Sequence, residues 1–191
     1  MKVLGIDQSL AKAAFIHMED GDVKKVSLSK TGKASVKTKR KDTTYYDNLH
    51  EQVHHVCLEL RDQVESFKPD WIVFESLSFG SVGNATRDLS VLFGALRETL
   101  ILIGYKDKVL EYAPTSLKSY ARDFLKPERQ VDGVLKTGKP KKVKMDKKLM
   151  VESVREIYGE GYLKEYNYSS GLDDLADATL LAHKVYYEKK V

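Results

Sequence analysis

The sequence predicts an α/β fold built on a mixed five-stranded sheet, with helices on both faces. Two observations support that prediction: three strand-like segments come first, and strands and helices then alternate along the rest of the chain. Such an order is typical of one sheet covered by helices. The composition agrees, because 191 residues, 42% of them hydrophobic and 31% charged, are enough for one globular domain with a buried core.

The predicted strands are short apolar runs bounded by turn residues. They span residues 2–7, 13–18, 23–29, 71–75 and 109–112. A turn rich in Asp and Gly at 19–22 joins the second strand to the third, so the first three strands should form a meander. The fourth, Trp-Ile-Val-Phe-Glu, is apolar up to its last residue and should be buried.

Five helices are predicted from apolar residues that recur at three- and four-residue spacing. They span residues 44–67, 85–103, 114–125, 145–158 and 172–188. Pro69 ends the first, Gly104 fits a C-cap after the second, and Pro114 fits the first turn of the third.

Two polar, basic segments interrupt this pattern, near 30–44 and 126–143. We expect residues 1–191 to form a single domain with these segments as basic insertions. Residues 24–41 carry eight Lys or Arg and no acid, and 126–148 carry nine basic and three acidic residues, so the rest of this chain of net charge +4 carries −10. Basic arms on an acidic body suit a carboxylate centre that acts on a polyanion. A solvated lysine-rich surface is the alternative interpretation.

The expected location is the cytoplasm, with no membrane partner. The single cysteine, Cys57, excludes an intramolecular disulfide and suits a reducing compartment. The N-terminal segment MKVLGID predicts a strand rather than a signal peptide, and no apolar run is long enough to cross a bilayer.

Four acidic residues are the main candidates for a functional site. Asp7 and Glu75 each end an apolar strand, whereas Asp174 and Asp177 lie one helical turn apart near the start of the last helix. Carboxylates at two strand ends and on one helix face can converge, and their oxygens suit Mg²⁺ or Mn²⁺ rather than zinc. A two-metal phosphodiesterase is therefore the first hypothesis.

Each acid also has a structural interpretation. Asp7 at a strand end is often only a turn residue, although Gly5 beside it allows close backbone approach by a ligand. Ser170 and Asp173 match a helix-capping pattern, which makes Asp173 a capping residue rather than a ligand. Spacing by itself leaves open which two acids of the last helix form the pair.

The motifs together resemble those of the RuvC family of Holliday junction resolvases, within the RNase H-like superfamily, and the basic insertions suit a phage-type member of it. They are Gly-Ile-Asp at Asp7, the strand-terminal Glu75, Glu-Tyr-Ala at 111–113, and Asp-x-x-Asp-Ala from Asp174. They occur in order over nearly the whole chain. The resemblance implies an RNase H-like fold.

The resemblance also implies an activity and the residues for it. Asp7, Glu75, Asp174 and Asp177 would hold two Mg²⁺ ions, for which Mn²⁺ substitutes, and the cut DNA would carry 5′-phosphate and 3′-hydroxyl ends. Lys118 would be a catalytic lysine. Lys147 would be a second one, although Lys144 and Lys148 match the same family helix nearly as well.

Further residues are expected to contact DNA. Phe79 follows the strand-terminal glutamate one position later than the base-stacking aromatic residue of the family, so loop packing is its alternative role. Arg87 and lysines and arginines of the two basic segments are the expected phosphate contacts: Lys37, Lys39, Arg40, Lys141, Lys142 and Lys144.

The expected substrate is branched DNA, above all the four-way junction, cut by a homodimer in a bacterial or phage-infected cell. Symmetric cleavage favours a two-fold dimer, and the apolar 85–103 helix is the candidate interface. Two alternatives remain: an RNase H-like nuclease acting on RNA or non-junction DNA, and a catalytically idle nucleic-acid-binding module. The opening Gly-Ile-Asp also occurs in actin-type ATPases, but the glycine-rich phosphate turns of that class are absent from this sequence.

Overall fold

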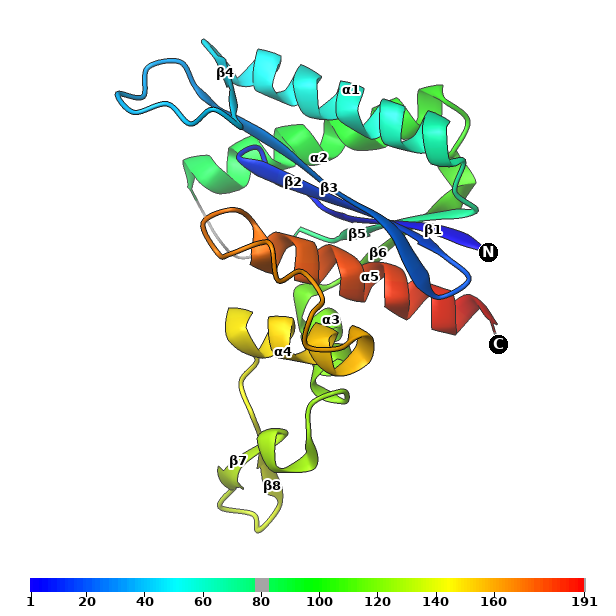
Figure 1. The fold of residues 1–191 in the computed structure, drawn as a ribbon, viewed down its shortest axis with the longest axis vertical. Helices are drawn as coiled ribbons and strands as arrows, with labels where there is room; N and C mark the ends of the chain where they lie inside the picture. The colour runs from blue at the N-terminus through cyan, green and yellow to red at the C-terminus, as the bar shows by residue number, and fades with distance from the viewer. Residues whose placement is uncertain (78–82, 191) are drawn as a thin grey trace.

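The computed structural model describes residues 1–77 and 83–190, and it has the predicted architecture of one sheet between two layers of helices (Figure 1). The central sheet has six strands in the order β4-β3-β2-β1-β5-β6. Its strands are β1 (Lys2–Asp7), β2 (Lys12–Glu19), β3 (Asp22–Lys33), β4 (Thr44–Tyr46), β5 (Trp71–Glu75) and β6 (Val109–Tyr112).

The sheet is mixed, as predicted. Strands β1, β2 and β3 form the antiparallel meander, whereas β5 pairs parallel with both β1 and β6. Parallel pairing places the C-terminal ends of β1 and β5 at the same edge of the sheet. The last residues of these two strands are Asp7 and Glu75.

The central sheet has one strand more than the five that were predicted. Thr44–Tyr46, which the apolar spacing placed at the start of a helix, forms β4 and pairs parallel with residues 31–33 of β3. The helix that follows, α1 (Leu49–Phe67), begins only after Asn48, whose side chain accepts a hydrogen bond from the Glu51 amide. An Asn cap and β-branched or aromatic residues before it favour this division.

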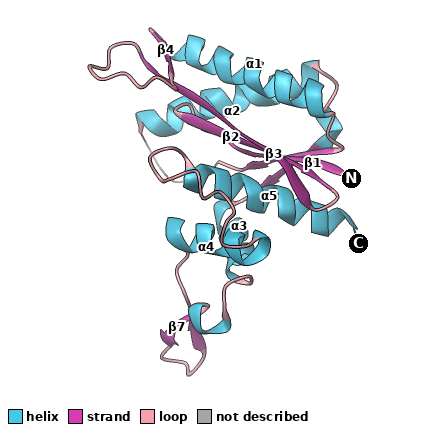
Figure 2. Ribbon diagram, in the orientation of Figure 1, coloured by secondary structure: helices cyan, strands magenta, loops and turns pink. Residues whose placement is uncertain are grey.

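Helices cover both faces of the sheet (Figure 2). On one face α1 and α2 (Asn84–Leu102) pack on strand residues such as Leu4 and Phe74. On the other face α5 (Leu172–Lys190), α3 (Pro114–Arg122) and α4 (Lys147–Tyr158) form a core with residues such as Val3 and Val73. Since neighbouring residues of a strand point to opposite faces, β1, β2, β5 and β6 each contribute to both cores.

The two basic segments extend away from the sheet. Beyond β3 the chain forms an arm over residues 34–43 before returning as β4. Between α3 and α4, after a short 3₁₀ turn (Pro127–Arg129), β7 (Val131–Val134) and β8 (Pro140–Lys142) form an antiparallel hairpin whose strand residues are all exposed. In Figure 1 this hairpin is the lowest part of the molecule, far from the arm. Over residues 1–77 and 83–190, no helix is both long and apolar enough to cross a membrane.

Candidate functional site

Close packing of α5 on β1 positions the candidate site. A Cβ atom at Gly5 would lie 2.2 Å from the carbonyl oxygen of Ala178 and 2.8 Å from Cβ of Ala182. The expectation that Gly5 makes room for a ligand was therefore wrong, because the helix occupies that space. Gly5 lies two residues before Asp7, and Ala178 directly follows Asp177, so this contact brings the acids of α5 to the end of β1.

Five carboxylates gather there, from β1, β5 and the first turns of α5. We call Asp7, Glu75, Asp173, Asp174 and Asp177 the acidic cluster. Burial raises the pKa of Asp7 well above its usual range, and the charges of Asp177 and Asp174 raise it further. Burial, followed by the charge of Glu75, raises the pKa of Asp177 to about 8. The four acids predicted from the sequence are thus close enough to affect one another's ionisation.

The fifth member, Asp173, is not the capping residue that the sequence suggested. The side chain of Ser170 exchanges hydrogen bonds with the backbone of Asn167 rather than with Asp173. Asp173 is 5% exposed, and its Oδ2 accepts a hydrogen bond from Nζ of Lys147. The capping interpretation was wrong. Helix α5 begins at Leu172, directly after Gly171, and Asp173 in its first turn contacts Lys147 of α4 instead of the residues that precede the helix.

The cluster has unpartnered oxygens that suit a hard cation. Three buried carboxylate atoms have no hydrogen-bond partner: Oδ1 of Asp173, Oδ2 of Asp174 and Oδ1 of Asp177. Buried carboxylates without partners are costly, and a divalent cation with oxygen ligands would remove that cost. In the part of the chain that the structure describes, however, no three acidic, histidine or cysteine side chains are already arranged as ligands of one ion. Metal binding would require the carboxylates to rotate toward one another.

Lysines of α3 and α4 lie beside the cluster. Lys147, at the start of α4, contacts Asp173, and this hydrogen bond raises the lysine's pKa. Burial raises the pKa of both Glu75 and Asp177, and the charge of Lys118 of α3 offsets part of that rise. Of Lys144, Lys147 and Lys148, Lys147 is the one that the described contacts place against an acid of the cluster.

Two residues of the β1–β2 connection belong to the site but were not predicted. The Nζ atom of Lys12 lies 3.8 Å from Oδ2 of Asp174. Gln8 is buried, and its Nε2 donates a hydrogen bond of 2.5 Å to the carbonyl oxygen of Glu75, which ties the ends of β1 and β5 together. The sequence signal for Gln8 was its position directly after Asp7, at the C-terminal end of a strand that carries a candidate ligand, whereas no local pattern marked Lys12, the first residue of β2.

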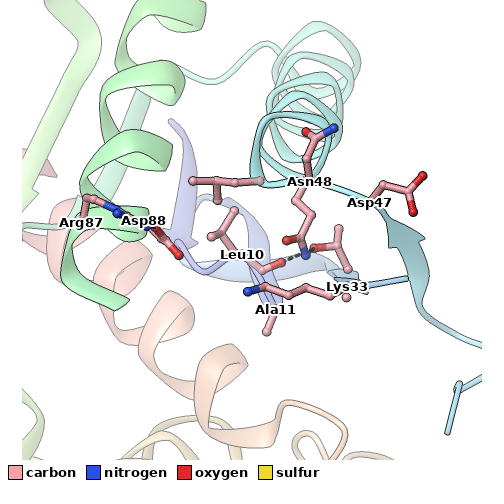
Figure 3. A pocket seen from close by; sticks show the side chains of 11 residues that line it. Leu10, Ala11, Lys33, Asp47, Asn48, Arg87 and Asp88 are labelled. Carbon is pink, nitrogen blue, oxygen red and sulfur yellow. Dashed lines mark hydrogen bonds and ion pairs between the residues drawn. The ribbon is translucent and has the colours of Figure 1, made fainter. Parts of the chain in front are cut away.

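A cavity of about 450 Å³ opens beside the same connection (Figure 3). It is lined by Leu10 and Ala11, by the start of α1 around Asn48, and by Arg87 and Asp88 of α2. Arg87, a predicted DNA contact, is exposed there, and its Nε and Nη2 lie 3.2 and 3.0 Å from Oδ1 of Asp88.

The other predicted DNA contacts lie on the two basic segments. Lys37, Lys39 and Arg40 are exposed on the 34–43 arm, and Lys141, Lys142 and Lys144 are exposed on or beside the β7–β8 hairpin. Phe79 lies outside the described residues. Of the two neighbouring histidines of α1, His54 is exposed and His55 bonds to Ser29 and Tyr46.

Comparison with known proteins supports the fold. No protein-family model matches the chain, and no curated protein is detectably similar in sequence. Among solved structures, Thermus thermophilus RuvC in complex with a Holliday junction substrate superposes with a TM-score of 0.65 at 16% identity, over all of this chain and 96% of that one. A second structure of Thermus thermophilus RuvC gives 0.60 at 19% identity, with the same coverage.

The yeast mitochondrial Holliday junction resolvase Ydc2 is a third structural neighbour, with a TM-score of 0.59 and 18% identity over 96% of this chain and 77% of that one. At these identities the likeness concerns the fold. The predicted resemblance to RuvC is confirmed at that level: the chain has the mixed α/β, RNase H-like architecture of RuvC and of other Holliday junction resolvases.

Proposed function

We propose that this protein is a structure-selective DNA endonuclease that resolves Holliday junctions by hydrolysing phosphodiester bonds. The observation that supports this most strongly is the acidic cluster, with its unpartnered buried oxygens, at the ends of β1 and β5 in a fold shared with resolvases. Neutral or basic surroundings would be expected of a site that only binds DNA. Buried acids at a nucleic-acid surface are costly unless they serve chemistry.

Asp7, Glu75, Asp174 and Asp177 would hold the divalent cations, and Asp173, already paired with Lys147, would lie at the edge of the site. Bound Mg²⁺ would supply an activated water and stabilise the leaving 3′ oxygen, giving 5′-phosphate and 3′-hydroxyl ends. The chain itself supplies Lys118, beside Glu75 and Asp177, to neutralise charge on the phosphate under attack. Gln8 keeps the two strand ends together while the phosphate is bound.

The experiment is cleavage of a synthetic four-way junction labelled on each strand in turn, with Mg²⁺, with Mn²⁺ or with EDTA. We expect paired nicks on opposing strands that a ligase can seal, in the presence of either cation and not in EDTA. A linear duplex of the same sequence is the substrate control and should not be cut.

The matched variant is Asp7→Asn, which removes one charge without changing the volume of the side chain. It should lower the cleavage rate by at least about a hundredfold while junction affinity changes little, because the basic arms supply the phosphate contacts. Junction binding without nicking by the wild type would indicate a binding module instead. Equal cleavage of duplex DNA or RNA would indicate a general RNase H-like nuclease.

A further inference from the structure

A second, basic groove lies between the 34–43 arm and the turn that joins β1 to β2. It has a volume of about 220 Å³ and is lined by residues that include Lys12, Lys30, Thr31, Arg40 and Tyr45. We call it the arm groove. Its lining, which lies wholly within residues 11–45, contains three basic and no acidic side chains. Drug-sized ligands usually need pockets of about 300 Å³ or more, so this groove suits a smaller anionic group.

Lys12 connects the arm groove to the acidic cluster. Its Nζ lies 3.8 Å from Oδ2 of Asp174 and donates a hydrogen bond of 3.2 Å to the carbonyl oxygen of Tyr168. One lysine therefore lines the groove and also contacts the cluster. A chain of phosphates bound in the groove would continue directly to the acids.

The wall of the groove is formed by specific contacts rather than by a loose loop. Nη1 of Arg40 donates a hydrogen bond of 3.1 Å to the carbonyl oxygen of Ser169, which lies just before α5. The backbone amide of Arg40 donates to the hydroxyl of Tyr45 at 2.6 Å. The ring of Tyr45 in turn packs on Gly32, where a Cβ atom would lie 2.8 Å from its Cε1. The arm is thus held against the loop that leads to the acidic cluster.

The cations of the groove have partners that a phosphate can replace. Lys30 pairs with Asp42 at 2.5 Å, and the side chain of Asp42 is 58% exposed. Only the aspartate of this pair is exposed, because the Lys30 side chain is 14% exposed, so a phosphate oxygen can replace the Asp42 carboxylate while Lys30 stays in the wall of the groove. Arg40 and Lys12 bond backbone carbonyls, which are weaker partners for a cation than a phosphate oxygen.

We propose that the arm groove binds the phosphate backbone of one DNA strand as that strand leaves the acidic cluster, with Lys12, Lys30 and Arg40 as its phosphate contacts. The volume of the groove admits one backbone and not a duplex. This inference rests on the proposed nuclease function for its choice of DNA, but it concerns binding and is testable without cleavage.

The test measures binding of the metal-free protein to a fluorescent four-way junction in EDTA, between about 50 and 200 mM salt. Lys30→Ala and Arg40→Ala should each weaken binding about three- to tenfold and reduce the slope of log affinity against log salt by about 0.7–0.9, the value for one lost phosphate contact. Arg40→Lys, which keeps the charge, should retain most of the slope.

Lys24→Ala is the matched control. Lys24 lies at the opposite end of β3 from Lys30 and also pairs with an exposed aspartate, Asp22, at 3.1 Å, but its own side chain is 48% exposed and lies outside the groove. This variant should leave both affinity and slope unchanged. A scan with neutral methylphosphonates should then locate the strand, because the defect of Arg40→Ala should disappear when the phosphate that Arg40 contacts is already neutral.

The proposal is overturned if Lys30→Ala and Arg40→Ala behave like Lys24→Ala, or if Arg40→Lys loses as much slope as Arg40→Ala. It is also overturned if the slope changes with RNA but not with DNA. Failure of the proposed nuclease function would look different: the wild type would not nick junctions in Mg²⁺, while the slope changes in EDTA would still be seen.

Discussion

Asp177 lies in an electrostatic environment that disfavours its charged form. Burial and the neighbouring carboxylates raise its pKa to about 8, and its Oδ1 has no hydrogen-bond partner. Groups of this kind are retained at functional sites at the expense of stability. Removing the charge should therefore stabilise the metal-free protein.

We expect Asp177→Asn to raise the free energy of unfolding in EDTA by about 2 kcal/mol near pH 8. A carboxyl with a raised pKa keeps its proton in the folded state above pH 4 while the unfolded chain loses it, so wild-type stability falls as the pH rises toward 8. The difference between variant and wild type should accordingly shrink toward pH 4. Urea denaturation at both pH values measures it.

Added Mg²⁺ provides the control for that prediction. The cation should raise the melting temperature of the wild type, because it binds the folded state, and should raise that of Asp177→Asn less. A variant less stable than the wild type in EDTA would contradict the account of an electrostatically costly cluster.

The sequence predicted site residues most accurately where they lie at the ends of strands. Asp7 and Glu75 were predicted from their places at strand ends, and the structure brings both to one edge of the sheet. Asp173 and Lys12 were missed. A helix-capping motif described Asp173 equally well before its partner Lys147 was known, and no local pattern distinguishes Lys12 from a solvated lysine.

At the scale of elements, the contact between α5 and β1 is what assembles the site. It depends on the absence of a side chain at Gly5, where the carbonyl oxygen of Ala178 would lie only 2.2 Å from a Cβ atom. Backbone cannot move aside as the end of a flexible side chain can. Even one added methyl group should therefore displace the helix.

Gly5→Ala should cost about 2–3 kcal/mol of folding free energy and reduce cleavage more than binding, because it shifts Asp174 and Asp177 away from Asp7. Gly94→Ala in α2 is the control: a Cβ atom there meets nothing within 4 Å, and alanine should stabilise the helix by about 0.5–1 kcal/mol. Thermal unfolding of the two variants compares them. Equal stability would contradict the close packing at Gly5.

The β7–β8 hairpin is a separate element whose contribution should be to binding alone. All residues from 131 to 142 are exposed, so replacing them with a short Gly-Ser linker should change the melting temperature by no more than about 2 °C. Junction affinity should fall about tenfold or more, since several basic side chains are lost.

Charge reversal distinguishes the contribution of the hairpin's charge to junction binding from the contribution of its shape. Lys141→Glu with Lys142→Glu should weaken junction binding and lower its salt dependence, whereas the same change at Lys106 and Lys108, exposed on another surface turn, should have a much smaller effect. Electrophoretic mobility shifts at two salt concentrations measure this. Equal effects of both pairs would indicate non-specific charge attraction only.

At the scale of the whole molecule, we propose that two chains associate through α2. Three apolar side chains of this helix are exposed: Val91 near its middle by 40%, and Ile101 and Leu102 at its C-terminal end by 45% and 76%. Scattered apolar residues are normal on a surface, but the last two are adjacent. A two-fold pair would place two acidic clusters on one junction, which symmetric cleavage requires.

Light scattering after gel filtration tests this. The wild type should have twice the 21.7 kDa mass of the chain, and Leu102→Glu should shift it to the monomer and turn paired nicks into single ones. Leu135→Glu, on the hairpin and 46% exposed, is the control and should remain a dimer. A wild-type monomer that still makes paired nicks would contradict the dimer.

Local patterns in the chain were enough to predict the α/β class, the mixed sheet and the four acids, because periodicity and strand ends are properties of neighbouring residues. The sixth strand was not predictable in the same way, since Thr44–Tyr46 becomes a strand only by pairing with the extension of β3. The partners of each acid were decided by packing between distant segments: α5 on Gly5, α4 against Asp173, and the β1–β2 turn against Asp174. Such contacts join residues that are far apart in the sequence. Which side chains are in contact is therefore determined only by the packing of the helices on the sheet.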